Sequence, residues 1–323
     1  MQIITSKDNE NIKSIKKLKE RKYRDLNNEY IIEGIKILKE AIQEKAVIKK
    51  IVICEECLAN NIIDEKLLYE IAKYDCLYVS KKIFEGLTDV SKPQGILAVV
   101  EKNNKKDINY NEDIIVALDG LQDPGNLGTI LRTLDSANLS QVIVSKDTVD
   151  AYNPKVVRST MGAIFRVNIV EAENLKETLK EMKRHKYKVM CTDLTASKNI
   201  YEIDYYKKIL VIGNEANGIS KELLDMADEK IIIPMLGKTE SLNASVATSI
   251  IVYEYVRRKI GIRIEIWVGI WGTFLKSLFV NKNTVYFSVY CVFVGALVWI
   301  NRWYLWLVKI SNYFLHLRNL KLS

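Results

Sequence analysis

Four apolar residues run directly into a loop of small and polar residues in the stretch Ile209-Leu210-Val211-Ile212-Gly213-Asn214-Glu215-Ala216-Asn217-Gly218. An uninterrupted apolar run of this length, rich in β-branched residues, predicts a buried strand. Glycine and asparagine after it supply left-handed backbone and exposed amide groups, which a ligand can approach closely. Considered alone, the loop is explained at least as well by a tight turn that binds nothing.

Two further junctions have the same form, with an apolar run, then a polar loop, then helical periodicity. They are Ile114–Leu118 before Asn126-Leu127-Gly128 and Arg132-Thr133, and Ile231–Ile233 before Pro234-Met235, Gly237 and Glu240-Ser241-Leu242-Asn243-Ala244-Ser245. In an open α/β sheet the ligand binds outside the carboxyl ends of the strands, where such loops converge. Three loops of this kind therefore predict a functional site rather than three unrelated turns.

The common nucleotide and metal signatures are absent from the sequence. No G-x-G-x-x-G follows a strand and no G-x-x-x-x-G-K-[ST] occurs. His185 and His316 lie far from each other and from any cysteine pair, so neither a histidine triad nor a zinc site is predicted. Cys54 and Cys57 form a single C-x-x-C, more typical here of a buried strand end and a new segment than of zinc or redox chemistry. Five irregularly spaced cysteines indicate a reducing compartment.

Taken in order, the three polar loops resemble the three motifs of the SpoU (TrmH-like) branch of the SPOUT RNA methyltransferases. The likeness extends to flanking segments and covers about residues 1–260. These segments are Tyr152-Asn153-Pro154-Lys155 with Arg158-Ser159 and Met161-Gly162, and, nearer the amino terminus, Tyr30-Ile31-Ile32-Glu33-Gly34 and Lys92-Pro93-Gln94-Gly95.

The resemblance implies an α/β fold in two domains. A small substrate-binding domain is expected over residues 1–100, a polar linker over 101–113, and a SPOUT catalytic domain over 114–260. The end of that catalytic domain is expected to form a deep trefoil knot, a rare exception to unknotted chain topology. S-adenosylmethionine is the implied cofactor, bound in a bent form within the knot. Proteins of this family are usually homodimers whose active site uses groups from both subunits.

By position, the resemblance assigns cofactor binding mainly to the second and third loops. The residues are Gly213, Asn214, Glu215, Gly218, Ile233, Met235, Leu242 and Ala244. It assigns catalysis to five polar residues. These are Asn126, Arg132, Glu215, Ser241 and Asn243. For Glu215, acceptance of loop amide hydrogen bonds is an equally good interpretation, and Ser241 equally fits a helix cap.

The expected chemistry needs one group beside the acceptor. A neutral ribose 2′-hydroxyl is a poor nucleophile, so a positioned group must polarise or deprotonate it as the methyl group approaches in line. The sulfonium already activates that methyl group, and no metal is required. Arg132 is the candidate, either as a bidentate clamp on a neighbouring phosphate or as a base in a special local field, because arginine normally stays protonated. A surface ion pair is the plainer alternative.

Basic residues are dense in residues 10–24, where Ile12, Ile15 and Leu18 recur at helical spacing. Contacts to phosphate supply most sequence-independent affinity for nucleic acid, so this stretch is predicted to bind RNA, although a solvated helix face is the plainer interpretation. The predicted RNA-binding residues are Lys13, Lys16, Lys17, Arg21, Lys22, Arg24 and, further along the chain, Arg158.

Residues 261–323 form an atypical hydrophobic tail. All five tryptophans lie in it, and Arg263 onward carries seven Lys or Arg but one acid, Glu265. No charged residue occurs from Asn283 to Asn301, close to the roughly 17–25 residues that a transmembrane helix needs. Three explanations stay open: a membrane anchor, an extension that packs on this protein or a partner, and translation in a shifted frame after a true end near Lys259.

The resemblance therefore implies an S-adenosylmethionine-dependent RNA ribose-2′-O-methyltransferase, since only RNA carries that hydroxyl. The small basic α/β domain favours ribosomal RNA, with transfer RNA as the runner-up. Residues 1–25 are too polar and basic for a signal peptide, which predicts a cytoplasmic enzyme. Two hypotheses from other classes are a noncatalytic RNA-binding factor in ribosome assembly and a membrane-tethered protein defined by its tail.

Overall fold

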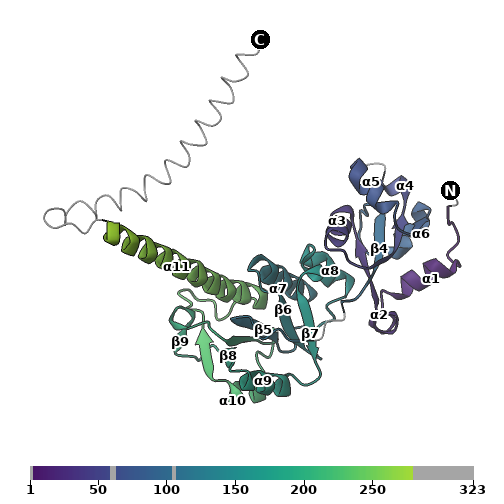
Figure 1. Cartoon of the computed structure of the whole chain (residues 1–323). Coiled ribbons are helices and arrows are strands. Elements are labelled where there is room, and N and C mark those ends of the chain that lie inside the picture. Colours follow the sequence, from purple (N-terminus) through teal and green to yellow (C-terminus); the bar gives the residue numbers. More distant parts are fainter. Residues whose placement is uncertain (1–2, 59–62, 104–106, 279–323) are drawn as a thin grey trace, which may run out of the picture. The chain divides into compact units, whose positions relative to one another are not determined.

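Two β-sheets lie in the part of the chain that ends at Gly261, which is one compact unit. The computed structural model describes residues 3–58, 63–103 and 107–278, with side chains up to residue 261. Figure 1 shows the first sheet in the purple and blue part of the chain and the second in the teal and green part. Each sheet is covered by helices on both faces.

The first sheet has four strands in the order β1-β4-β2-β3. Its strands are β1 (Glu29–Glu33), β2 (Ile48–Ile53), β3 (Cys76–Tyr78) and β4 (Ile96–Glu101). Its helices are α1 (Glu10–Lys17), α2 (Arg21–Asn27), α3 (Ile35–Gln43), α4 (Glu55–Leu58), α5 (Glu65–Ile71) and α6 (Lys81–Leu87). The strand end expected at Cys54 is confirmed, since β2 ends at Ile53 and Cys54 is buried.

Alternation along β4 divides the core of this domain, because successive side chains of a strand point to opposite faces. Leu97 and Val99 pack with α1 and α6, whereas Ile96 and Ala98 pack with α3 and α5. Ile12, Ile15 and Leu18, whose helical spacing was noted in the sequence, pack in the same cluster as Leu97 and Val99. The basic side chains between them consequently face away from the sheet.

The helical stretch at residues 10–24 is interrupted. Helix α1 ends at Lys17, the backbone at Glu20 is extended (φ −96°, ψ 135°), and α2 begins at Arg21. The Arg24 guanidinium donates from Nη1 to the carbonyl oxygens of Leu18 (2.8 Å) and Lys19 (2.7 Å). A helix end leaves such carbonyl groups without partners, so Arg24 stabilises the break. Helical spacing alone does not reveal this.

The second sheet has seven parallel strands in the order β7-β6-β5-β10-β8-β11-β9. They are β5 (Ile114–Leu118), β6 (Gln141–Ser145), β7 (Asn168–Ala172), β8 (Lys188–Thr192), β9 (Lys198–Asn199), β10 (Lys208–Ile212) and β11 (Glu229–Ile232). The three strands predicted from apolar runs are confirmed as β5, β10 and β11, with Ile233 just past the end of β11. The predicted α/β fold class is thereby confirmed.

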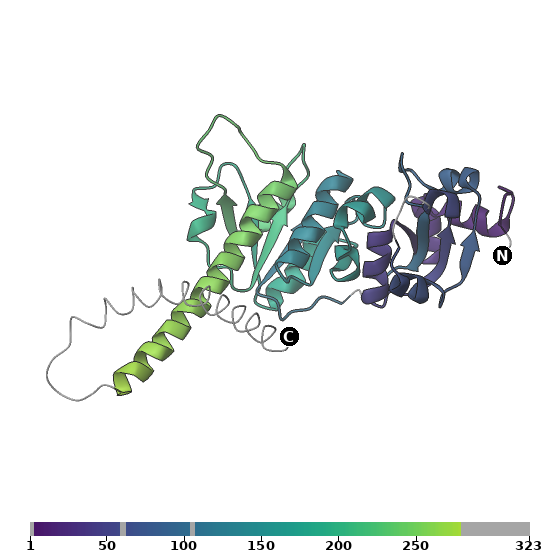
Figure 2. The ribbon, with the colours of Figure 1, turned by 90° about the horizontal axis from the view of Figure 1, so that it is seen from above.

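Helices cover both faces of this sheet. They are α7 (Pro124–Ser136), α8 (Pro154–Thr160), α9 (Leu175–Arg184), α10 (Lys221–Met226) and α11 (Ala244–Leu278), with short 3₁₀ helices η1 (Ala163–Phe165) and η2 (Ile200–Glu202). Residues of α7, α8 and the start of α11 pack on one face, and α9 and α10 pack on the other. Hydrogen bonds between the hydroxyl groups of Thr133 and Ser249 (2.9 Å) and from Tyr253 to Ser136 (3.0 Å) join α7 to α11, and the ribbons of these two helices lie side by side in Figure 2.

Strand β10 enters the sheet between β5 and β8, although β9 precedes it in the sequence. The chain therefore returns to the middle of the sheet after passing its edge. Strand order does not determine how the chain threads, so the trefoil knot stays a prediction. The polar stretch expected as a linker is partly packed, since Asn109 exchanges two hydrogen bonds with Gln141 (2.9 and 2.6 Å) and the Tyr110 ring stacks on His185.

Helix α11 continues beyond residue 260, where the family likeness ends. Among the described residues, no helix has the length and apolar character to cross a bilayer. The anchor considered for residues 283–301 lies outside the described residues. The three explanations of the tail therefore stay predictions.

Gly128 sets how closely α7 and α8 approach. A Cβ atom there would lie 2.6 Å from Ser159 Cβ and 3.0 Å from the Val156 carbonyl oxygen. We expect Gly128→Ala to lower the free energy of unfolding by about 1–3 kcal/mol in urea denaturation, because overpacking forces neighbours to shift. Gly86→Ala in exposed α6, where a Cβ meets nothing within 4 Å, is the control and should be neutral or stabilising. Unchanged stability of Gly128→Ala would contradict the close packing.

Candidate cofactor and catalytic site

A cavity of about 310 Å³ lies at the carboxyl ends of β8, β10 and β11. All eight residues predicted for cofactor binding line it, and so does Ser241. Asn126, Arg132 and Asn243 are not in its wall. The structure thus brings the second and third motif loops together around one cavity, while their role in binding stays a prediction.

The sequence analysis missed the contribution of β8. Thr192, Asp193 and Leu194 at its end also line the cavity. Asp193 accepts hydrogen bonds from the backbone amide (2.8 Å) and hydroxyl (2.7 Å) of Thr195, and these bonds, with Lys230 nearby, lower its pKa against the effect of burial. The apolar run Val189-Met190-Cys191 before Thr192-Asp193 is a fourth junction of the kind described above, and it could have been found by the same rule.

The backbone of the second loop folds back on itself at the cavity. Asn214 and Gly218 exchange two backbone hydrogen bonds of 2.9 Å, and Gly218 has a positive φ of 68°. A Cβ atom on Gly213 would lie 2.2 Å from the carbonyl carbon of Gly218 and 2.3 Å from the amide nitrogen of Ile219. Only glycine fits at Gly213, because the clashing atoms are backbone and cannot move aside cheaply.

One carboxylate links the first and second motifs. Glu215 accepts hydrogen bonds from the backbone amides of Gln122 and Asp123 (3.1 Å each) and from the Asn126 side-chain amide (2.9 Å). Asn126 in turn accepts one from the side-chain amide of Asn243 (2.9 Å), which extends the chain of bonds to the third motif. The three loops are therefore connected through side chains that the sequence analysis had grouped as catalytic.

Asn243 also begins α11. Its side-chain oxygen accepts from the amide (2.9 Å) and hydroxyl (2.7 Å) of Ser245, the pattern of a helix N-cap. Ser241, for which a helix cap was the alternative interpretation, is not the N-cap of α11, because Asn243 occupies that position. Asn243 thus orients both the helix and the hydrogen bond to Asn126.

The environment of Glu215 supports the ionised form. Burial raises the pKa of Glu215, but hydrogen bonds from Asn126 and from loop amides outweigh burial, and the pKa lies below its ordinary range. A carboxylate that is ionised at neutral pH can accept hydrogen bonds but has no proton to give. The structural interpretation of Glu215, that it accepts the loop amide hydrogen bonds, is the one the geometry favours.

Arg132 projects from α7 away from this network. It is exposed, and it forms no hydrogen bond or ion pair with any residue that the structure describes. It lies six positions after Asn126, which at 3.6 residues per turn places the two side chains roughly 120° apart around the helix. The surface ion pair considered for Arg132 is therefore not formed within the described part of the chain.

The predicted RNA-binding residues do not share one environment. Lys13, Lys16, Lys17, Arg21 and Lys22 are exposed, Arg158 is half-buried, and Arg24 is buried. Arg24 is a correction to the set, because its guanidinium is fully engaged by Asp150 and by two carbonyl oxygens. In this geometry the buried and paired guanidinium is shielded from an RNA phosphate.

A parallel α/β sheet with a cavity at three polar loops is the architecture of the SPOUT methyltransferases. Residues 113–253 match the SpoU rRNA Methylase family, and residues 9–98 match the MRM3-like substrate binding domain. The chain belongs to the SpoU rRNA methylase family. The predicted RNA ribose methyltransferase activity and S-adenosylmethionine cofactor are confirmed at the level of this family.

Individual relatives agree with this assignment. The 23S rRNA (guanosine(2553)-2'-O)-methyltransferase RlmP of Bacillus subtilis is 33% identical over 78% of this chain and 98% of its own length. A putative TrmH family tRNA/rRNA methyltransferase of Staphylococcus saprophyticus is 32% identical over 72% of this chain and 96% of its own. The AdoMet-bound rRNA methyltransferase from Sinorhizobium meliloti superposes with a TM-score of 0.70 at 31% identity, covering 80% of this chain and 98% of that one.

The cavity fits S-adenosylmethionine in size and lining. Its volume of about 310 Å³ lies at the small end of the roughly 300–1,000 Å³ typical of ligand sites, as a compact ligand requires. Ile212, Ile231 and Leu242 supply apolar wall, and the loop at Gly213 supplies backbone polar groups. The ionised carboxylate of Glu215 at the wall suits a cationic ligand.

Replacing Gly213 should weaken cofactor binding. We expect Gly213→Ala to weaken S-adenosylmethionine binding by at least about tenfold, because a displacement of the loop costs more than about 1.4 kcal/mol of binding. Isothermal titration of S-adenosylmethionine against the full chain measures this, with Gly86→Ala as the control that should bind normally. Normal binding by Gly213→Ala would show that the loop is not the cofactor site.

Replacing Glu215 should produce a pH-dependent loss of stability. Because its folded pKa is lowered, Glu215 stabilises the fold above its unfolded pKa, and this contribution disappears as the pH falls through the folded value. We expect Glu215→Gln to lower the free energy of unfolding by about 1 kcal/mol at pH 7, a modest effect because water screens this exposed loop. The difference from wild type should shrink below about pH 4. Glu222→Gln on exposed α10 is the control; a pH-independent loss would contradict this account.

Proposed function

We propose that this enzyme methylates a ribose 2′-hydroxyl of 23S ribosomal RNA, in the cytoplasm. The observation that carries the proposal is the hydrogen-bonded chain Asn243–Asn126–Glu215, which joins all three motif loops beside the cavity. The name of the Bacillus subtilis relative supports the choice of 23S rRNA. Transfer RNA is the second candidate, because the staphylococcal relative is named for both RNA classes.

The residues of this chain position the reaction. S-adenosylmethionine supplies an activated methyl group. Glu215 and Asn126 fix the first loop against the second, so that the cofactor cavity and the start of α7 keep one relative geometry. Asn243 fixes the third loop in the same way. Groups held in this manner lower the entropic part of the barrier to in-line transfer.

Arg132 is proposed as a phosphate clamp. Guanidinium groups remain protonated in proteins and match phosphate oxygens in bidentate geometry. An exposed Arg132 without a described intramolecular partner is available for such a contact. A base needs a special environment, and the described structure offers no charged partner that would create one. The clamp would hold the RNA backbone so that the acceptor hydroxyl meets the methyl group.

We further propose that the enzyme is a homodimer in which Arg132 serves the cavity of the partner. Arg132 lies outside the cavity wall of its own chain and on a different side of α7 from Asn126. Val246 and Tyr253, seven residues apart and so on the same side of α11, are 46% and 49% exposed. A second copy of this chain would cover these two side chains.

Loss of Arg132 should remove activity without removing the cofactor. We expect Arg132→Ala to reduce methyl transfer to unmodified 23S rRNA by about 100-fold or more, the usual effect of losing one preorganised charged group. Binding of S-adenosylmethionine should be unchanged. Arg184→Ala on exposed α9, whose side chain pairs with Glu181, is the matched control and should retain activity. Labelled methyl transfer to separate ribosomal and transfer RNA pools measures both variants and identifies the RNA class.

Mixing two inactive variants tests the shared site. A mixed dimer of Arg132→Ala and Gly213→Ala chains would contain one site with an intact cofactor cavity and an intact Arg132. We expect part of the activity to return on mixing. No recovery, in mixtures shown by mass to exchange subunits, would place Arg132 in the site of its own chain. Transfer by Arg132→Ala alone at the wild-type rate would contradict the clamp itself.

A further inference from the structure

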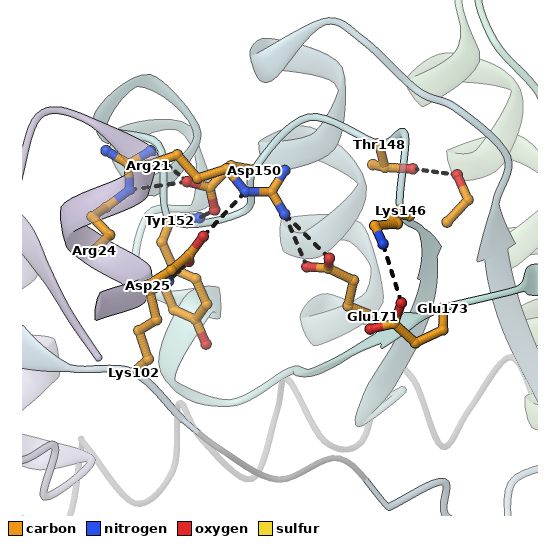
Figure 3. A network of polar contacts seen from close by, with 11 residues as sticks. Arg21, Arg24, Asp25, Lys102, Lys146, Thr148, Asp150, Tyr152, Glu171 and Glu173 are labelled. Atoms are coloured by element: carbon orange, nitrogen blue, oxygen red, sulfur yellow. Dashed lines mark hydrogen bonds and ion pairs between the residues drawn. The ribbon is translucent and has the colours of Figure 1, made fainter. Parts of the chain in front are cut away.

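Arg24 is buried where the basic helices meet the catalytic domain. Its side chain is 3% exposed and that of its partner Asp150 is 12% exposed. Arg24 donates to Asp150 from Nε (2.9 Å) and from Nη2, and its Nη1 caps the carbonyl groups at the end of α1. The guanidinium thus joins α1, α2 and the segment before α8 at one point (Figure 3).

Asp150 transmits this contact to the catalytic domain. Its second oxygen accepts from the amide of Tyr152 (2.9 Å), whose ring packs against Tyr30 of β1 with centroids 4.8 Å apart. Lys102 also lies against that ring, 5.0 Å from its centroid, and pairs with Asp25 of α2. Tyr152, which leads into α8, is therefore enclosed by charged and aromatic groups.

Helix α8 is in direct contact with the helix that bears the first motif. Asn153 caps α8 by accepting from the amide of Lys155 (2.9 Å). Ser159 of α8 lies against Gly128 of α7, the close approach described above. Helix α7 carries both Asn126 and Arg132. A continuous path of short contacts thus runs from Arg24 to the proposed catalytic residues.

We propose that Arg24 and Asp150 form a positioning pair, which sets the basic helices α1 and α2 at a fixed place relative to α7 without touching RNA. The proposal rests on the proposed RNA substrate. A buried ion pair adds little net stability but requires one geometry, because a displaced partner leaves an unpaired buried charge. An apolar contact at this point would tolerate sliding. RNA bound to α1 and α2 is thereby presented to Arg132 in one register.

A direct phosphate contact by Arg24 makes a different prediction about salt. The affinity for RNA falls as salt rises, and each phosphate contact that is lost reduces the magnitude of the slope of log K against log salt by about 0.7–0.9. Removing the carboxylate of Asp150 adds net positive charge, so purely electrostatic RNA binding should then become tighter. If Arg24 and Asp150 act as a positioning pair, the two replacements should instead have the same effect.

The experiment compares Arg24→Met, Asp150→Asn, Arg24→Lys and Lys16→Met in the full chain, with Lys16 as an exposed residue of α1. We expect Arg24→Met and Asp150→Asn each to reduce kcat/KM for 23S rRNA about tenfold, with the salt slope and S-adenosylmethionine affinity unchanged. Lys16→Met should weaken RNA binding and reduce the magnitude of the salt slope, as the loss of one exposed phosphate contact does. Arg24→Lys should recover part of kcat/KM, because it keeps the charge.

Two results would overturn the pairing role. One is a lower salt slope in Arg24→Met together with tighter RNA binding in Asp150→Asn, which would make Arg24 a phosphate contact. The other is lower thermal stability with unchanged kcat/KM, which would make the pair purely structural. Unaltered S-adenosylmethionine affinity would show that a variant is folded. If Arg24→Met does not fold, Arg24→Lys takes its place in the comparison.

Hydrogen exchange tests the Arg24–Asp150 pair independently of the proposed RNA substrate. If the wild type methylates neither RNA pool, the substrate proposal fails. Amide exchange needs no RNA and still tests the pair. In Arg24→Met and Asp150→Asn we expect faster exchange in α2 and α8 and unchanged exchange in β10. Unchanged exchange in α8 would show that the pair does not hold the two domains together.

Discussion

The architecture of the site depends on the Glu215 carboxylate. Three separate loops reach the same end of the sheet, and nothing in a parallel sheet obliges them to keep a fixed relative geometry. Glu215 supplies that constraint, since its oxygens accept from two backbone amides and one side chain of the first motif. Its lowered pKa follows from the same bonds. One charge therefore holds the loops together and also contributes a negative group to the wall of the cavity.

Arginine has two opposite roles in this protein, and burial decides between them. Arg24 is enclosed, saturated with acceptors and fixed, whereas Arg132 is exposed without a described partner. Arg166 resembles Arg24, because it joins Asp135 of the catalytic domain to Glu40 of α3 at 2.9 and 2.6 Å. Arg21, which pairs with Glu171 of β7 at 3.2 Å, is a third arginine that connects the domains, whereas the lysines of α1 predicted to bind RNA are exposed. Sequence shows the same positive charge in each case.

Local rules predicted the parts of the structure that depend on local chemistry. Apolar runs before polar loops located β5, β10 and β11, and the cavity lies at the ends of the last two of these strands. The same rule applies at β8, but the short run around Met190 was not recognised. Arg24 could not be assigned correctly, because its partner Asp150 lies 126 residues away in the sequence. The break between α1 and α2 could not be predicted either. The side-chain cap by Arg24 and the packing around it override the helical spacing of the sequence.

The strand order also has a consequence for how the protein is made. Strand β8 pairs with β10 and β11, both of which follow it in the chain. During synthesis from the amino terminus, β8 therefore emerges with neither neighbour and keeps its backbone groups unpaired until β10 has arrived. Pairings between distant segments form slowly because loop closure must come first. The cavity, lined by loops after these same strands, is therefore among the last features of the nascent chain to form, and it is complete only when nearly all of the sheet has been translated.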